Sequence, residues 1–433
     1  MLSDQSPQRT NSFTPANGSS GGRGSAQTRS RLAALDGLRL VAALLVVMFH
    51  YVGTEFTNIW GAKNHEIFPW LYPVSTYGYL GVQFFFIISG FVICMSSWDR
   101  KLGDFFVSRT VRLYPVYWFA VLFTALVVTV MHPIASQISA IKPPHSLSDV
   151  LSNLTMLQEA AGIPHVDSVY WTLWVELRFY LLFAIVVWRG LTYRRVVLFC
   201  ALWGVASLVA SSSNISVLNN VVMPVYSWYF IAGIALYLIH RFGQTPLLWG
   251  IVGLCWLQAQ RDAYGATTYM NGMLKTSMEW RYSALLITAF FVAIAAVALG
   301  WLSWARWRWL TVAGVLTYPV YLMHQNIGLT IIRGLHGSVP KWPLLVGTVT
   351  AMLLLAWLAH RLIERPLAPR MKRMLVRGIE QVGTATPRIT VARSDGPSGS
   401  NGASVGSGDM PNGATSLSLG QPTGGHGGAR TGL

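Results

Sequence analysis

The stretch RLAALDGLRLVAALLVVMFHY, residues 31–51, decides the fold class of this chain. It is apolar enough to enter a bilayer, yet it carries Asp36, Arg39 and His50. A charged group at membrane depth is costly and is retained where it faces the interior of a helix bundle with partners. On a helix, Arg39 and His50 would lie about three turns apart, or ~16 Å, with ~20° of net rotation. Asp36 would neighbour Arg39 on the same surface. The pattern predicts a transmembrane helix with an ion pair near one end of one face and an imidazole near the other.

The composition of the whole chain is that of a polytopic membrane protein. Of its 433 residues, 53% are hydrophobic, 11% are charged and 18 are tryptophan, which does not resemble a soluble domain. The net charge of +16 agrees with Lys and Arg collected in cytoplasmic loops next to anionic lipid, so no nucleic-acid partner is predicted. The three cysteines fall in apolar segments, so neither a disulfide framework nor a metal site is predicted.

Two polar segments flank the apolar part. Residues 1–31 are rich in Ser, Gly, Gln and Arg and lack the apolar core of a signal peptide. Residues 373–433 lead from a short basic stretch into Gly- and Ser-rich low-complexity sequence. We expect two disordered tails around a transmembrane domain at 32–372. The lack of a signal peptide, together with many spans, predicts a multi-pass protein of a bacterial inner membrane. The sequence does not indicate an oligomeric state.

The segment between the tails contains ten candidate transmembrane helices. They lie near 34–53, 77–97, 112–131, 169–188, 195–211, 220–240, 246–259, 282–302, 310–332 and 342–363. If the N-terminus is cytoplasmic, most loop cations fall in cytoplasmic loops, which is the positive-inside pattern. The sequence therefore predicts an all-α integral membrane protein with about ten spans and both termini in the cytosol.

Three ionisable residues from three spans fall at similar predicted depth. His50 lies a few residues from the outer end of its span. Glu176, in YWTLWVELRFYLL, lies roughly 10 Å below the outer end, and His324, in LTYPVYLMHQNIGLTII, lies ~12 Å below it. A lone buried histidine is most often a structural hydrogen-bonding residue. Three such groups at matched depth predict a shared site.

A second cluster lies at the predicted cytoplasmic end. In FFVSRTVRLYPVYWF, Arg109 and Arg112 are three residues apart and are followed by Tyr114. This spacing aims both guanidiniums one way, which suits bidentate binding of phosphate. Arg39 approaches the same level from the first span. Anchoring by the positive-inside rule is the alternative, but the shared direction predicts a site for a phosphate-bearing ligand that enters from the cytosol.

The second predicted span contains a Ser89–Gly90 pair within YGYLGVQFFFIISGFVICM. Such a pair allows a close backbone approach or a local break in the helix. The sequence around Ser89 is not a nucleophile elbow. We expect close packing or a ligand-lining role rather than nucleophilic catalysis.

The segments RLAALDGLRLVAALLVVMFH, FFFIISGFVI, RTVRLYPVYW, YWTLWVELRFYLL, TYPVYLMH and the terminal IERP together resemble the membrane-bound acyltransferase 3 family. Its members include O-acetylases of O-antigen, exopolysaccharide, Nod factor and macrolides. The resemblance covers residue 31 to about residue 366, and the absence of a soluble domain after the tenth span resembles the stand-alone branch. One departure is Leu40, where the family often has Gly, and this departure concerns helix packing more than chemistry.

The resemblance implies an enzyme that takes an acyl group from cytosolic acyl-CoA, with acetyl-CoA as the expected donor substrate, and passes it to a hydroxyl, usually on a sugar. No permanently bound cofactor is implied. Asp36 would position Arg39, and the arginines would hold the phosphates of coenzyme A. The residues expected to bind acyl-CoA are Arg39, Arg109, Arg112, Asp36, Ser89 and Tyr114.

The expected catalytic residues are His50, Glu176 and His324. His50 would act as general base on the acceptor hydroxyl, and Glu176 would orient it or stabilise its imidazolium. His324 would bind the acceptor or share in handling the proton or the oxyanion. A covalent acyl-histidine on His50 is a second route.

The acceptor stays open at this stage: exopolysaccharide, O-antigen, Nod factor or a small glycosylated metabolite, with acetyl or succinyl as the group transferred. The depth of His50 favours a periplasmic or membrane-embedded acceptor such as a lipid-linked glycan. The competing hypothesis is a transporter or flippase of lipid-linked sugars that uses the intramembrane His, Glu and Arg as a proton or substrate path. The sequence lacks the inverted repeat that many transporters show.

Overall fold

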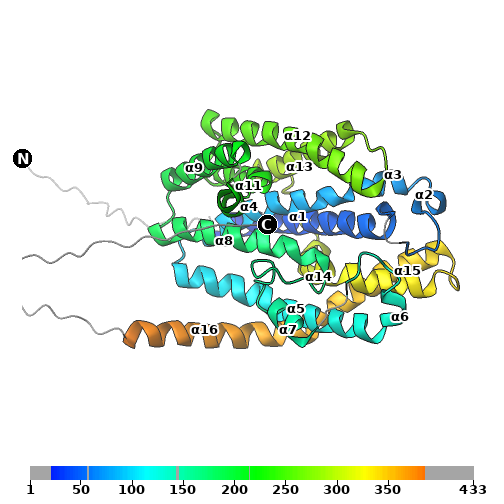
Figure 1. The fold of residues 1–433 in the computed structure, drawn as a ribbon. Coiled ribbons are helices and arrows are strands. Elements are labelled where there is room, and N and C mark those ends of the chain that lie inside the picture. Colours follow the sequence, from blue (N-terminus) through cyan, green and yellow to red (C-terminus); the bar gives the residue numbers. More distant parts are fainter. Residues whose placement is uncertain (1–20, 56–57, 143–145, 214, 386–433) are drawn as a thin grey trace, which may run out of the picture. The chain divides into compact units, whose positions relative to one another are not determined.

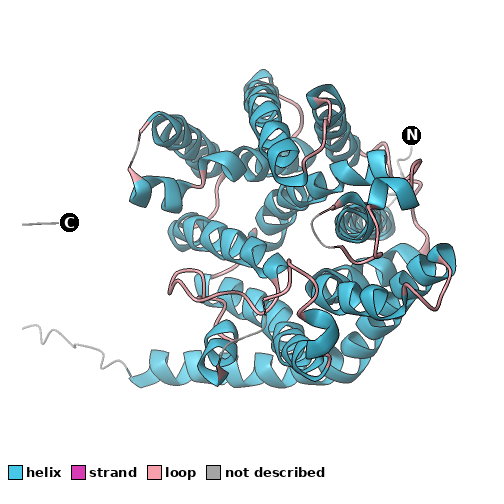
Figure 2. Cartoon of the chain, turned by 45° about the vertical axis from the view of Figure 1, so that its right-hand side comes forward, coloured by secondary structure: helices cyan, strands magenta, loops and turns pink. Residues whose placement is uncertain are grey.

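A computed structural model describes residues 21–55, 58–142, 146–213 and 215–385, and this part of the chain consists of helices and loops without a strand (Figures 1 and 2). Contacts divide the chain into Met1–Gly383 and Thr384–Leu433, and the bundle that positions the site belongs to the first unit. Its long helices are α1 (Gly21–Met48), α4 (Gly81–Ser97), α5 (Leu102–Val130), α8 (Trp171–Arg189), α9 (Tyr193–Ser212), α11 (Pro224–Phe242), α12 (Pro246–Leu274), α13 (Trp280–Ala298), α14 (Arg308–Leu335), α15 (Lys341–Ala359) and α16 (Arg365–Ala385).

Short helices complete the described part. They are α2 (Asn64–Ile67), α3 (Tyr72–Ser75), α6 (His132–Ala135), α7 (Leu147–Asn153) and α10 (Ser216–Val222), with the 3₁₀ turns η2 (Thr76–Leu80) and η3 (Ser168–Tyr170) and the π-helical turns η1 (Phe49–Gly53) and η4 (His360–Glu364). In Figure 1, α2 and α3 lie at the upper right of the bundle and α6 lies at its lower right.

Within the described residues, eight helical segments are long and apolar enough to cross a membrane. Each of the ten predicted spans coincides with a long helix, but α12 and α14 do not belong to the eight. Side chains such as Leu122, Leu126 and Val292 are more than half exposed on the bundle, as expected where lipid replaces water. The protein is therefore an all-α, multi-pass membrane protein. The count of ten spans and the cytoplasmic termini stay predictions.

The boundaries of the predicted tails fall inside helices. The first helix begins at Gly21 rather than after residue 31, and α16 continues to Ala385, past residue 373. In α16, Met371 and Leu375 are half-buried while Lys372 and Arg373 are exposed, so its apolar residues recur at a helical spacing. The remaining parts of the predicted tails, residues 1–20 and 386–433, lie outside the described residues.

Two glycines bring α4 and α11 into backbone contact. A Cβ atom added to Gly90 would collide with the carbonyl oxygen of Phe230, and one added to Gly233 would collide with that of Ile87. Only a residue without a side chain permits such an approach. The close packing predicted for the Ser89–Gly90 pair is confirmed.

The helices α1 and α14 pack side by side and run parallel. Gly314 of α14 lies against Asp36 near one end of the contact, and Gly328 lies against Tyr51, just beyond α1, near the other. The hydroxyl of Tyr51 also donates a hydrogen bond to the carbonyl oxygen of His324 (2.8 Å). This pairing sets the register between the first predicted span and the helix that carries the second histidine.

Candidate active site

Two cavities lie along α1 and α14. We name the first, of ≈ 90 Å³, the arginine cavity; its lining includes Arg39, Ser89, Arg109, Arg112, Thr172, Glu176, Tyr180 and Tyr321. We name the second, of ≈ 540 Å³, the histidine chamber; its lining includes His50, Tyr79, Gln83, Ser168, Trp171, Tyr226, Tyr269, Met270, Tyr321 and Gln325.

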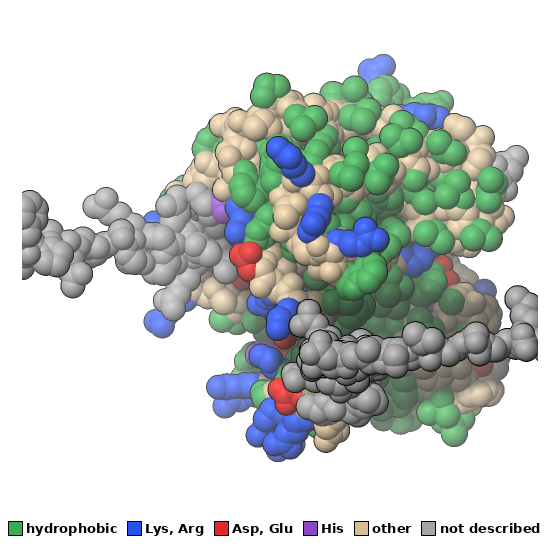
Figure 3. All heavy atoms as spheres, turned by 90° about the vertical axis from the view of Figure 1, so that its left-hand side faces the viewer, with side chains coloured by type: hydrophobic (Ala, Val, Ile, Leu, Met, Phe, Trp, Pro, Cys, Tyr) green, Lys and Arg blue, Asp and Glu red, His purple; other side chains and the backbone are tan. Residues whose placement is uncertain are grey.

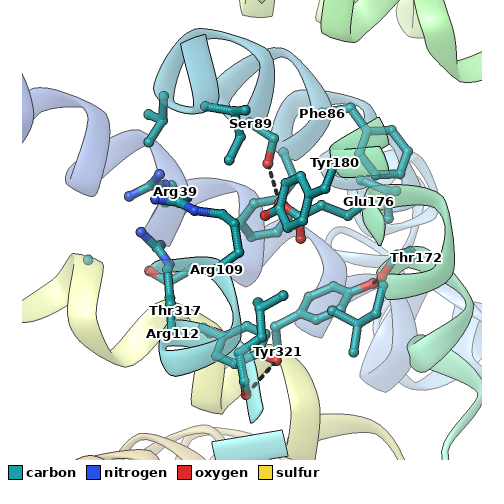
Figure 4. A pocket seen from close by; sticks show the side chains of 18 residues that line it. Arg39, Phe86, Ser89, Arg109, Arg112, Thr172, Glu176, Tyr180, Thr317 and Tyr321 are labelled. Carbon is teal, nitrogen blue, oxygen red and sulfur yellow. Dashed lines mark hydrogen bonds between the residues drawn. The ribbon is translucent and has the colours of Figure 1, made fainter. Parts of the chain in front are cut away.

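The three predicted phosphate-binding arginines do meet in one cavity. Figure 4 shows Arg39, Arg109 and Arg112 gathered on one side of it. The Nη1 atom of Arg39 lies 3.2 Å from Oδ1 of Asp36, so Asp36 holds Arg39 as expected. Arg109 is held by the hydroxyls of Ser96 and Ser108 (3.3 and 3.2 Å). Arg112 is exposed to solvent and also lines the cavity.

Glu176 belongs to the arginine cavity and not to the histidines. Its Oε1 accepts hydrogen bonds from the hydroxyls of Ser89 (2.8 Å) and Tyr180 (2.5 Å). Figure 4 shows Ser89 pointing directly at this carboxylate. In the part of the chain that the structure describes, no hydrogen bond joins Glu176 to His50. The expectation that Glu176 orients His50 is therefore wrong.

A difference in level explains this error. The hydroxyls of Thr172 on α8 and Tyr321 on α14 are 2.8 Å apart, which fixes the level of one helix against the other. Glu176 lies four residues beyond Thr172 in one direction, and His324 lies three residues beyond Tyr321 in the other. The two side chains are thus about 10 Å apart along the bundle. The sequence predicts a common depth for Glu176 and His324 because that depth is measured from the ends of the predicted spans, which are uncertain.

The charges of the arginine cavity favour an anionic ligand. Arg39, Arg109 and Arg112 line it against one acidic residue, Glu176, and Asp36 neutralises one guanidinium from the side. One positive charge in this group therefore lacks an acidic partner. A part-buried cation of this kind is stabilised by an anion that forms charge-assisted hydrogen bonds.

The two histidines form a hydrogen-bonded pair. The Nδ1 atom of His50 lies 2.9 Å from the carbonyl oxygen of Val46 and 3.1 Å from Nε2 of His324. The Nδ1 atom of His324 lies 2.8 Å from the carbonyl oxygen of Tyr321. Carbonyl oxygens only accept, so in the neutral pair each Nδ1 carries the proton. The Nε2 atom of His324 then accepts from His50, and Nε2 of His50 keeps a free lone pair beside the chamber.

His50 sits on a π-helical turn that the sequence did not predict. The turn spans Phe49–Gly53 and directly follows α1. Because a π turn contains more residues than an α turn, the side chains beyond it no longer follow the spacing of an ideal α-helix. Gly53 ends the turn against the backbone carbonyl of Ser75, where a Cβ atom would collide. The turn is thus a packed feature of the fold.

Aromatic and neutral polar side chains surround the histidine pair. Tyr79, Trp171, Tyr226 and Tyr269 line the chamber together with Gln83, Ser168 and Gln325. The side chains of Ser168 and Gln325 bond to each other (2.9 and 2.6 Å). No Asp, Glu, Lys or Arg lines the chamber among the described residues. An uncharged ligand with ring faces and hydroxyls would fit such a lining.

Other site residues were misassigned or missed by the sequence analysis. Tyr114 does not line the arginine cavity; it donates to the carbonyl oxygen of Thr155 (3.0 Å). Tyr114 follows Arg112 by two residues, which corresponds to about 200° of rotation on a helix. Tyr114 therefore lies on another face of α5. Tyr180 and Tyr321 were missed, although each lies one helical turn from a predicted residue, Glu176 and His324 respectively. That spacing alone could have identified both.

Comparison with known proteins assigns the chain to a family. A family model described as an acyltransferase domain, that of the acyltransferase 3 family, matches residues 32–361, which is more than half of the chain. The chain belongs to the acyltransferase 3 family. The resemblance seen in its sequence motifs is thereby confirmed, and the protein is an acyltransferase.

One curated relative of this acyltransferase 3 chain covers most of both sequences. It is Acyltransferase MdmB of Streptomyces mycarofaciens, 27% identical over 374 residues, which are 78% of this chain and 91% of the relative. No solved structure matches the chain. The family assignment favours the enzyme over the transporter hypothesis.

Proposed function

We propose that this acyltransferase transfers an acyl group from cytosolic acyl-CoA to a hydroxyl of a carbohydrate, such as exopolysaccharide, O-antigen or another glycan. The acyl group that we propose first is acetyl. The observation that carries the proposal is the free Nε2 atom of His50. It faces a roomy, uncharged chamber that adjoins a cavity with three arginines. A base next to an anion site is what transfer from a phosphate-bearing donor requires.

The arginine cavity supports acyl-CoA as the donor. Coenzyme A carries several phosphates on one end of a long, thin arm. Arg39, Arg109 and Arg112 would bind the phosphates bidentately, and the arm would run past Ser89 and Glu176 toward the histidine chamber. The two ends of this path are joined by α1 and the π-helical turn that follows it, since Arg39 lies on α1 and His50 on the turn, roughly 16 Å further along.

His50 can supply the proton transfers for direct acyl transfer. As the acceptor oxygen attacks the thioester carbonyl carbon, its proton moves to Nε2 of His50. The resulting imidazolium shares its positive charge with His324 through the 3.1 Å hydrogen bond. When the carbon–sulfur bond breaks, the proton passes from Nε2 to the departing sulfur, which leaves as the thiol of coenzyme A. The acyl-histidine route would start from the same Nε2 atom.

The chamber lining supports a carbohydrate acceptor. Sugar rings have apolar faces that pack on aromatic side chains and hydroxyls that bond to neutral polar ones. Tyr79, Trp171 and Tyr226 offer the first kind of contact, and Gln83 and Gln325 the second. A lipid-linked glycan in the membrane would bring such a ring to the chamber.

The distribution of cations supports the proposed orientation. Exposed Arg100 and Lys101 lie in the loop after α4, and exposed Arg189 and Arg194 lie at the end of α8 and the start of α9. Figure 3 shows Lys and Arg gathered on the left-hand end of the bundle of Figure 1. We place this end in the cytosol by the positive-inside rule, in a bacterial inner membrane. We also infer that α12 and α14 cross it, since α14 owes its lower hydropathy to buried polar residues around His324.

The proposal is tested by acetyl transfer from radiolabelled acetyl-CoA into the glycolipid fraction of membranes that contain the protein. His50→Ala should reduce transfer about a hundredfold or more, while His132→Ala, which removes an exposed histidine, should leave it unchanged. Retained transfer in His50→Ala would remove His50 from the chemistry. If the wild type transfers no label from acetyl-CoA or succinyl-CoA, the proposed donor is wrong.

A further inference from the structure

One side chain stands between the two cavities. The arginine cavity and the histidine chamber share two lining residues, Val82 and Tyr321. Tyr321 has the larger side chain of the two, so its phenol ring contributes more to the boundary between the cavities. The two spaces differ in size, ≈ 90 Å³ on the arginine side and ≈ 540 Å³ on the histidine side.

The ring of Tyr321 is held at its tip and on its side. Its hydroxyl lies 2.8 Å from the hydroxyl of Thr172 and 3.4 Å from the carbonyl oxygen of Val169. Thr172 itself donates to that carbonyl (2.9 Å), which leaves its oxygen free to accept from Tyr321. The ring of Phe85 packs edge-on against the tyrosine ring at 5.5 Å between centroids. Three helical elements, α4, η3 and α8, thus hold one ring from α14.

The same residue also holds the histidine pair in place. The backbone carbonyl of Tyr321 accepts a hydrogen bond from Nδ1 of His324, and Nε2 of the same histidine accepts one from His50. The backbone of Tyr321 therefore positions the base, while its side chain borders both cavities. A change of its side-chain rotamer would alter the boundary between the cavities without moving the backbone that holds His324.

The position of the ring bears on which acyl groups can react. A donor bound through the three arginines approaches His50 from the arginine side. Its acyl carbon must come within reach of Nε2 of His50, and the rest of the acyl chain must find room near the ring. A methylene that a pocket cannot accommodate costs about tenfold or more in specificity. A fixed ring at this point would therefore discriminate among acyl chains by length.

We propose that Tyr321, clamped by Thr172, is the residue that limits the length of the acyl group presented to His50. This inference rests on the proposed function, since it takes acyl-CoA as the donor. With the ring in place, a short acyl group reaches Nε2 of His50, while a longer chain is held back on the arginine side. Without it, the two cavities join and a longer chain extends into the histidine chamber.

The test uses the full chain in detergent and a pentanoyl-CoA analogue that carries a photoreactive diazirine near the end of its acyl chain. Cross-links in the wild type should fall on residues that line the arginine cavity alone, such as Leu113 and Tyr180. In Tyr321→Ala they should shift to residues that line the chamber alone, such as Tyr269 and Met270. The affinity for the analogue relative to acetyl-CoA, measured by competition, should rise about tenfold or more.

Two milder variants keep the inference falsifiable if Tyr321→Ala does not fold. Tyr321→Phe keeps the ring but loses its hydrogen bond, and Thr172→Val removes the partner; both should show a smaller shift in the same direction. An unchanged cross-link map and affinity ratio in all three variants would overturn the role of Tyr321 and leave the proposed function intact. Wild-type labelling that free coenzyme A does not compete away would overturn the donor itself, and this inference with it.

Discussion

The Nε2 atom of His324 lies 3.1 Å from the Nδ1 atom of His50. The chain of hydrogen bonds begins at the backbone of Tyr321, passes through both imidazole rings, and ends at a nitrogen beside the chamber. A histidine thus takes the place that a carboxylate occupies in other base-orienting pairs. Because the second ring is neutral, it can share a positive charge but cannot neutralise it.

This pairing predicts graded effects of substitutions at His324. In His324→Ala, His50 keeps its bond to the carbonyl of Val46 but loses the partner that fixes its ring, so kcat should fall by roughly 10- to 100-fold. His324→Gln offers an oxygen that can accept from Nδ1 but cannot share the charge, so its kcat should lie between those of the wild type and His324→Ala. Both are measured as acetyl transfer at saturating acetyl-CoA.

The comparison of the two variants separates two roles. Equal activity of His324→Gln and the wild type would reduce His324 to an orienting group. Full activity of His324→Ala would show that the 3.1 Å contact has no part in the chemistry.

The arginine cavity predicts a defect in donor binding. Arg109→Ala and Arg112→Ala should each raise the KM for acetyl-CoA by roughly 10- to 100-fold, because each removes a charge-assisted hydrogen bond to phosphate. Membrane insertion should be unaffected, since other cations set the orientation. Arg100→Ala, an exposed arginine at the same end of the bundle, is the matched control. An unaltered KM in the double variant would refute the phosphate site.

The corrected place of Glu176 changes what its removal should do. Glu176→Gln keeps an acceptor for Ser89 and Tyr180 and removes a negative charge near the arginines. Binding of an anionic donor should be unchanged or tighter, and kcat should change little. Had Glu176 oriented His50, kcat would fall roughly ten-thousand-fold. Steady-state kcat and KM for acetyl-CoA in Glu176→Gln and Ser89→Ala decide between the two.

Much of this arrangement could be predicted from local sequence. Spacing along a single helix correctly predicted that Arg39 pairs with Asp36 and that Arg109 and Arg112 line one cavity. The Ser89–Gly90 pair correctly indicated a close helix crossing. These features depend on the geometry of a single helix, or on the absence of a side chain, and both are visible in the sequence.

Relations between helices could not be predicted in this way. The relative level of Glu176 and His324 depends on how α8 and α14 slide past each other, and a shift of two turns leaves the sequence pattern unchanged. The π turn at Phe49–Gly53 interrupts α-helical spacing without a distinct sequence signal. The boundary formed by Tyr321 exists only because Thr172, from another helix, meets it.

The backbone contact between α4 and α11 predicts that its two glycines are required for stability. Gly90→Ala and Gly233→Ala each place a methyl group on a backbone carbonyl of the facing helix. A carbonyl within a helix cannot move aside, so the helices must separate, at a cost of about 1–3 kcal/mol or more. Because Ser89 lies next to this contact and bonds to Glu176, donor binding should weaken together with stability.

Gly250→Ala has open space around the new methyl group and should be neutral or slightly stabilising, by up to ~1 kcal/mol. Thermal unfolding in detergent measures all three, and a midpoint unchanged in Gly90→Ala and Gly233→Ala would show that the two backbones are not in contact.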